Sequence, residues 1–209
     1  MTESSFRPSK QLRTVPAMAL DKLAHSAFIG AVYHLARIRD FVASPCLQTT
    51  WSEDTDLDET TKRKCQTDLN QFHWHTRAFF WELVASFDTM LQWANRRYGL
   101  GVCEHQVKWK RIPRKSSKDQ AEWDVKYALL ESAWNSEWFY ETRMYRNFSH
   151  RGFLLVQGEY DDHLGKSKPT LRLIWLIPAR EGQQEYVDLL QQLSQYLEHM
   201  RQLGEKVFA

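Results

Sequence analysis

One uninterrupted helical pattern, from about Asp58 to Tyr98, constrains the fold of this chain more than any other feature. A helix of that length extends for about 60 Å at about 1.5 Å per residue, so the other elements must pack along it. Most residues between Ala78 and Phe87 are apolar or aromatic and cover more than one helical face, which indicates neighbours on several sides. Gly99 and Gly101 end the pattern. We expect this helix to be the central element.

Further helices are expected around the central one. Apolar residues recur at every third or fourth position in each segment, and Pro16 suits a first helical turn. Ser117 or Asp119 can cap the helix that follows the central one. Together the expected helices cover about Pro16 to Ala43, Asp58 to Tyr98, Asp119 to Ala133, Ser136 to His150 and Gln183 to Lys206.

Two β-rich runs, Phe153 to Glu159 and Thr170 to Ile177, predict a small hairpin with a long loop. The fold class that we expect is mostly α: an up-and-down bundle of four to five helices, with this β-hairpin appended before the C-terminal helix. The length fits one domain. The expected organisation is a flexible arm at 1–14 and a single helical domain at 15–209, with the bundle core at about 16–151, the hairpin at about 153–177 and the last helix at about 183–206.

The charge balance limits how the chain could bind nucleic acid. Its 28 Lys and Arg residues against 26 Asp and Glu residues leave a net charge of +2. That is too little for nonspecific affinity through bulk charge. Any nucleic-acid binding must come from local patches.

The cysteines and the apolar runs predict a cytoplasmic protein. Cys46, Cys65 and Cys103 are widely spaced, odd in number and form no C-x-x-C pair, so we expect neither a disulfide framework nor a zinc knuckle. The N-terminus has no apolar signal-peptide core, and no uncharged apolar run reaches the ~18 residues that a membrane span needs. We expect no export and no membrane insertion.

A polar stripe near the end of the helix expected at 136–150 could bind phosphate. At about 3.6 residues per turn, one helical face carries Arg143, Arg146, Asn147 and His150. An imidazole can take a proton from a ribose 2′-hydroxyl, while guanidinium groups stabilise the charge that grows on the phosphate. The alternative is a structural network, in which these side chains complement the helix dipole and satisfy backbone carbonyls.

Two segments together resemble a known family. The central helix contains Phe79-Phe-Trp-Glu-Leu-Val-Ala-Ser-Phe-Asp88, and a later helix ends in Tyr145-Arg-Asn-Phe-Ser-His-Arg151. The combination resembles HEPN domains (higher eukaryotes and prokaryotes nucleotide-binding) over roughly Pro16 to Arg151. The resemblance implies an up-and-down helical bundle, usually dimeric. Active members of the family are metal-independent endoribonucleases that use an Arg, a following polar residue and a His.

The resemblance implies a role for each stripe residue and leaves the choice of arginine open. His150 would be the general base or acid, Asn147 a positioning group, and Arg146 or Arg143 the phosphate clamp, in a site formed across a dimer. Arg146 is followed by a polar residue but lies closer to His150 than the family pattern requires. Arg143 has the wider spacing but is followed by Met144.

Asp88 and Glu82 are candidate supporting carboxylates, because both lie in the most apolar stretch of the central helix. A carboxylate in such surroundings usually needs a cationic or hydrogen-bonding partner. We hypothesise that one of them pairs with Arg143 or Arg146 within ~4 Å. The alternative is that both face a solvated edge.

A basic loop offers a second candidate contact with RNA. Its cations surround a tryptophan, which is the composition of a surface that follows a phosphate backbone and stacks on bases. The alternative is an ordinary solvated loop. The predicted RNA-binding residues are Lys108, Trp109, Lys110, Arg111, Arg114 and Lys115.

Several other site classes lack support. His73 and His75 would point about 200° apart on a helix, so they cannot chelate one ion, and His25 and His34 are no better spaced. The chain contains no G-x-x-x-x-G-K-[ST], no G-x-G-x-x-G and no G-x-S-x-G motif. We expect no metal and no cofactor.

Two functions remain as hypotheses. The first is an HEPN-like RNA-binding protein or metal-independent endoribonuclease that acts through the Arg143 to His150 face. The second is a non-catalytic helical module for protein interaction, for example one partner of a toxin–antitoxin or defence pair. The expected partners are RNA, a second copy of the chain in a homodimer, and a possible protein partner.

Overall fold

A computed structural model describes residues 17–44, 58–150, 156–159, 172–175 and 189–209. The side chains of residues 17–20, 148–150 and both strands lie outside the described part. The predicted arm at 1–14 and the first residues of the predicted C-terminal helix, 183–188, also lie outside it.

The central helix is α3, Glu59–Arg97, and it begins and ends where the sequence predicts. The carboxylate of Asp58 caps its N-terminus by accepting hydrogen bonds from the backbone N–H groups of Thr60 (2.9 Å) and Thr61 (3.0 Å). After its C-terminus Gly99 has a φ of 60°, a left-handed conformation that glycine adopts without steric cost. The long helix is therefore delimited by its local sequence.

The other described helices agree with the prediction of a mostly α fold. Asp119 caps α4 by accepting a hydrogen bond from the backbone N–H of Glu122 at 3.0 Å. Two short 3₁₀ turns, η1 and η2, lie in the basic loop. The bounds are α1 Ala17–Val42, η1 Glu104–Gln106, η2 Trp109–Arg111, α4 Gln120–Asn135, α5 Glu137–His150 and α6 Leu189–Phe208.

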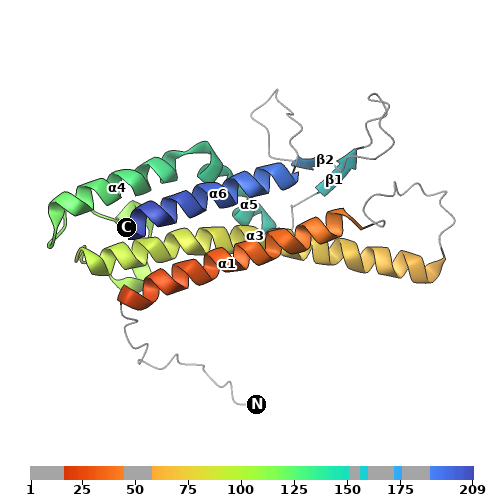
Figure 1. Ribbon diagram of the computed structural model, residues 1–209, viewed down its shortest axis with the longest axis horizontal. Coiled ribbons are helices and arrows are strands. Elements are labelled where there is room, and N and C mark those ends of the chain that lie inside the picture. The colour runs from red at the N-terminus through yellow and green to blue at the C-terminus, as the bar shows by residue number, and fades with distance from the viewer. Residues whose placement is uncertain (1–16, 45–57, 151–155, 160–171, 176–188) are drawn as a thin grey trace, which may run out of the picture.

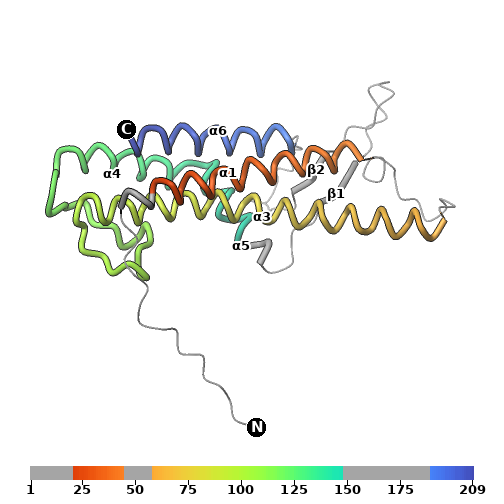
Figure 2. Tube along the Cα trace, turned by 60° about the horizontal axis from the view of Figure 1, so that its bottom comes forward, coloured from red at the N-terminus to blue at the C-terminus, as the bar shows by residue number. Residues whose placement is uncertain are grey.

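The described helices pack side by side in an up-and-down bundle of four columns, and α4 and α5 together make up one of these columns (Figure 1). The α1 and α3 helices run antiparallel along most of α1, and α6 lies beside both in the two views (Figures 1 and 2). Aromatic contacts show that α4 and α5 lie one after the other along α3, and that both run antiparallel to it. Trp123 contacts Tyr98, Trp134 contacts Phe87, and Tyr145 contacts Phe80. The α4–α5 column therefore occupies one position of the bundle.

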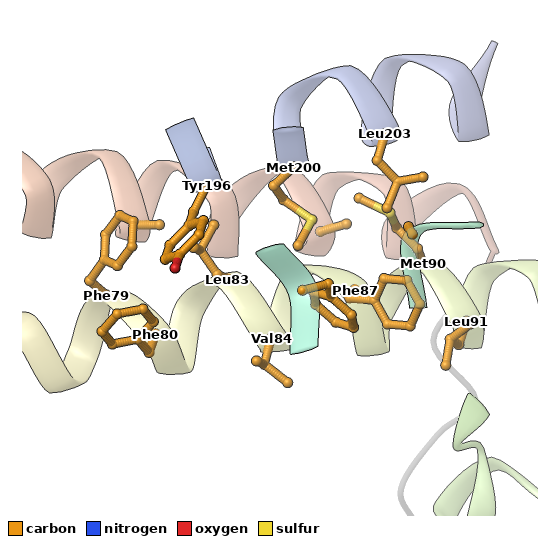
Figure 3. Packing of buried hydrophobic residues seen from close by; sticks show 14 of the residues in the cluster. Phe79, Phe80, Leu83, Val84, Phe87, Met90, Leu91, Tyr196, Met200 and Leu203 are labelled. Atoms are coloured by element: carbon orange, nitrogen blue, oxygen red, sulfur yellow. The ribbon is translucent and has the colours of Figure 1, made fainter. Parts of the chain in front are cut away.

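The core lies where α3 faces the other columns (Figure 3). Phe79, Phe80, Leu83 and Phe87 of α3 are fully buried, and they pack with residues of α6 such as Tyr196. The buried positions of α3 cover much of its circumference, as expected for a helix with neighbours on several sides.

Part of the predicted hairpin at 153–177 is described. Strands β1 (Val156–Glu159) and β2 (Arg172–Trp175) pair antiparallel, with Val156 opposite Trp175 and Glu159 opposite Arg172. The connecting residues lie outside the described ranges. The full extent and the role of the hairpin stay predictions.

Two further observations concern the helices and the cysteines. Within the described ranges, no helix is both long and apolar enough to cross a membrane. Cys65 is buried and disulfide-bonded, a single bond that the cysteine spacing did not predict. The cytoplasmic setting stays a prediction.

Candidate nucleic-acid interface

Arg143 holds the junction between α4 and α5. Its guanidinium donates hydrogen bonds to the carbonyl oxygens of Trp134 (Nη2, 3.1 Å) and Phe139 (Nε, 3.3 Å). Its Cζ atom lies 3.6 Å from the centroid of the Trp134 ring, in a cation–π contact. Burial lowers the pKa of this guanidinium. Because Trp134 lies in the last turn of α4, Arg143 supplies a cation where the helix dipole is negative.

Arg146 and Asn147 lie one turn further along α5. Arg146 donates a hydrogen bond from Nη2 to Oδ1 of Asn147 at 3.2 Å, and its Cζ atom lies 5.8 Å from the centroid of the Trp81 ring. Asn147 is exposed and Arg146 is half-buried. The backbone of His150 is in the last turn of α5, but its side chain lies outside the described part. Of the two arginines, Arg146 is thus the one beside the exposed Asn147.

Asp88 lies between two basic segments that are distant in the sequence. Burial raises the pKa of its carboxyl group, and the positive charges of Arg146 and Lys108 act in the opposite direction. Both cations therefore lie close enough to Asp88 to interact with it electrostatically. We call Asp88, Lys108, Arg146 and Asn147 together the Asp88 face.

The hypothesis of a direct carboxylate–arginine pair is wrong. Neither Asp88 nor Glu82 forms an ion pair within 4.0 Å with Arg143 or Arg146, and all four side chains belong to the described part. The guanidinium of Arg143 is engaged at the α4–α5 junction instead. Asp88 interacts with Arg146 only over a longer distance.

Glu82 belongs to the contact between α3 and α1. A Cβ atom on Gly30 of α1 would lie 2.9 Å from Cδ of Glu82, so the glycine provides the room for this side chain. Burial raises the pKa of the Glu82 carboxyl group. Six positions along a helix correspond to about 240° of rotation, so Glu82 and Asp88 cannot share a face. The helical period alone could have predicted that these two carboxylates lie on different faces of α3.

Trp109 packs inward and does not lie open in the basic loop. Its ring stacks on that of Trp134 at 6.0 Å and contacts that of Tyr127 at 5.1 Å. The tryptophan therefore anchors the loop to α4 by burying aromatic surface. Its predicted base stacking would require this packing to open.

Some cations of the basic loop form hydrogen bonds or ion pairs with described side chains, and others do not. Arg114 pairs with Glu131 at 2.7 Å and lies over the Tyr127 ring, and Arg111 donates to the side-chain oxygen of Gln106. Three exposed side chains in this part of the structure make no hydrogen bond or ion pair with described residues: Lys108, Lys110 and Lys115.

A buried histidine pair was missed by sequence reasoning. Nδ1 of His34 lies 2.8 Å from Nδ1 of His75, which joins α1 to α3. Burial is the main cause that lowers the pKa of both imidazoles, with smaller contributions from His75 at His34 and from Arg37 at His75. The spacing of His34 and His75 in the sequence could not reveal this pair, because the two residues are on different helices. In the part of the chain that is described, no group of three or more His, Cys, Asp or Glu side chains could hold a metal ion.

Comparisons with protein-family models, curated proteins and solved structures find no match to this chain. Its function is therefore inferred from its own residues.

Proposed function

We propose that this chain is an HEPN-like RNA-binding protein that uses the Asp88 face, and that it cleaves RNA through His150 without requiring a metal. The observation that carries the proposal is that Lys108 and Arg146 both lie near enough to the half-buried Asp88 to act on the pKa of its carboxyl group. These cations come from the basic loop and from the polar stripe, two segments that are separate candidates for RNA contact on their own residues. Their proximity supports one shared surface for the phosphate backbone.

In the proposed reaction each residue has a separate task. Arg146 binds the scissile phosphate, and Lys108 binds a neighbouring phosphate. His150 takes the proton of the ribose 2′-hydroxyl, whose oxygen then attacks phosphorus while the bond from phosphorus to the 5′-oxygen breaks and this oxygen takes up a proton from water. Asn147 positions the phosphate, and the charge of Asp88 orients Arg146. Arg143 keeps the end of α4 and the start of α5 together, and so positions the stripe.

The decisive experiment compares wild type and His150→Ala on a mixed RNA pool in the presence of EDTA, after both have been shown to fold. We expect wild type to cleave and the variant to lose at least about a hundredfold in rate, as for removal of a general base. His25→Ala, which removes an exposed histidine on α1, is the matched control and should cleave normally. Equal cleavage by wild type and His150→Ala would exclude His150 from the chemistry.

RNA binding can be tested separately from cleavage. Neutralising Lys108, Lys110 and Arg111 together should weaken binding of a single-stranded RNA. The slope of log K against log salt should become shallower by about 0.7 for each phosphate contact that is lost. Arg201→Ala removes an exposed cation on α6 and should leave the slope unchanged. An unchanged slope in the triple variant would remove the basic loop from the interface.

A second function, a non-catalytic interaction module, is favoured by exposed apolar side chains on α1 and α3. Ile29 is 50% exposed, Tyr33 54% and Trp74 59%. The rings of Tyr33 and Trp74 both contact the imidazole of His75, so they lie on the same part of the surface. Exposed aromatic residues that gather in this way are typical of interfaces between proteins.

Sedimentation analysis distinguishes the two functions when it is combined with the cleavage test. A stable dimer that Tyr33→Ser and Trp74→Ser dissociate, together with no cleavage by wild type, would favour the interaction module. Cleavage that is lost in His150→Ala would favour the nuclease.

A further inference from the structure

A cleft between α5 and α6 has no role in the proposed RNA chemistry. It has a volume of about 260 Å³ and is lined by Glu137, Trp138 and Glu141 of α5 and by Gln192, Tyr196 and His199 of α6, among others. Glu141 and Arg146 are about 140° apart around α5, so the cleft opens on a different face from the stripe. We call it the α5–α6 cleft.

The carboxylate of Glu141 is held in a fixed orientation. Its Oε2 atom accepts hydrogen bonds from the hydroxyl of Tyr196 and from Nε2 of Gln192, the latter at 3.2 Å. Nε2 of Gln192 also lies 2.6 Å from the Tyr196 hydroxyl. Burial, with the hydrogen bond to Glu141 as a second cause, raises the pKa of Tyr196, so the phenol stays a neutral donor. The other oxygen, Oε1, has no partner among the described residues.

Glu137 places a second carboxylate one turn before Glu141. Neither carboxylate forms an ion pair within 4.0 Å in the described part of the structure. Like charges one turn apart on a helix repel each other. The two groups therefore create a negative potential at the cleft, and no described cation forms an ion pair with either of them.

The remaining walls are aromatic and amide groups. Trp138 lies between the two carboxylates in the sequence, and its ring stacks on the imidazole of His199 with centroids 5.4 Å apart and planes at 26°. This wall can cover an aliphatic stem, while the carboxylates bind charged ends.

We propose that the α5–α6 cleft binds a small organic cation that carries a guanidinium or primary ammonium group. The cationic head donates to the open Oε1 of Glu141, and a second cationic group pairs with Glu137. Charge-assisted bonds of this kind are about twice as strong as neutral ones. The Tyr196–Gln192 contacts preorganise Glu141, so binding does not require this carboxylate to be reoriented.

Isothermal titration of the full chain with agmatine tests the proposal, because agmatine carries a guanidinium and an ammonium on a four-carbon stem. N-butylurea, which has a similar shape but no charge, is the control ligand. We expect saturable binding of agmatine and none of N-butylurea. Glu141→Gln and Glu137→Gln should each weaken agmatine binding by about tenfold or more, whereas Asp124→Asn, which removes an exposed carboxylate on α4, should not.

Glu137→Gln should fold even if Glu141→Gln does not, because Glu137 is exposed and makes no hydrogen bond or ion pair with the described residues. The proposal can therefore be tested with this variant alone. Three results would overturn the proposal: no saturable binding by wild type, equal binding by wild type and both Gln variants, or equal binding of N-butylurea and agmatine. RNA cleavage is not a readout of this experiment, so the outcome is independent of the proposed nuclease function.

Discussion

Arg143 and Arg146 carry the same charge on nearly the same face of α5, but their surroundings differ. Arg143 donates to two backbone carbonyls and lies over Trp134. Arg146 contacts Asn147 and acts on the charge of Asp88. The first arginine holds the α4–α5 junction, and the second lies beside Asn147 and near the charge of Asp88.

We predict that Arg143→Ala lowers the free energy of unfolding by about 1–2 kcal/mol, from the lost hydrogen bonds and cation–π contact. RNA affinity should fall by much less than in Arg146→Ala. Denaturant unfolding and RNA titration of both variants check this, with Arg201→Ala as the surface control. Unchanged stability with loss of RNA binding in Arg143→Ala would instead make Arg143 the phosphate clamp.

The His34–His75 pair makes the stability of the protein sensitive to acid. The pKa of both imidazoles is lowered in the folded state, so the folded protein binds fewer protons than the unfolded chain as pH falls below the ordinary imidazole value of 6.5. Arg37 adds a positive charge near His75. The stabilisation is therefore fully present above pH 6.5 and is lost below it.

We predict that the melting temperature falls between pH 7 and pH 5, and that this fall is smaller in the double variant His34→Leu/His75→Leu. Melting curves across this range check the prediction. His25→Leu on the surface of α1 should retain the wild-type slope. Identical slopes in wild type and the double variant would show that other groups dominate the acid sensitivity.

At the scale of elements, the ends of α3 depend on single residues. Asp58 caps its first turn, and Gly99 turns the chain away after the last turn with a φ of 60°. Gly101 also has a positive φ, 72°, but a Cβ atom there would meet nothing within 4 Å. A Cβ atom on Gly99 would collide with Oγ of Ser117. A side chain at Gly101 would therefore cause backbone strain only, whereas a side chain at Gly99 would cause backbone strain and a steric clash.

We predict that Gly101→Ala costs about 1–2 kcal/mol of stability through left-handed backbone strain alone. Gly99→Ala should cost more, because Ser117 must also move, and its hydroxyl donates a 2.7 Å hydrogen bond to the Gly99 carbonyl. Chemical denaturation of both variants gives the comparison. Equal losses would mean that Ser117 moves without energetic cost.

At the scale of the whole molecule, α3 connects all the other helical columns. Phe87 makes the contact with the α4–α5 column, because its ring lies 4.4 Å from that of Phe139 in α5 and 6.0 Å from that of Trp134 in α4. The side chain is fully buried. A cavity at this point would loosen the junction that Arg143 also holds.

We predict that Phe87→Ala lowers the free energy of unfolding by about 3–5 kcal/mol. Val125→Ala on α4, where the side chain is 60% exposed, should change it by less than about 0.5 kcal/mol. Urea denaturation checks both variants. A small loss in Phe87→Ala would mean that the four columns repack around the missing ring.

The sequence by itself determined the helices, because their signals are local. The apolar period, Asp58 and Asp119 as caps, and Gly99 as a stop act within a few residues. These features predicted α1, α3, α4 and α5 to within a few residues and the mostly α fold.

Only the tertiary structure decided which side chains meet. Trp109 packs on Trp134, Arg143 reaches the end of α4, and His34 meets His75 across two helices. The direct pairing of Asp88 or Glu82 with an arginine was wrong for the same reason: it required the relative rotation of α3 and α5. Helix rotation is set by how all the columns pack together, and that information is distributed over the whole chain.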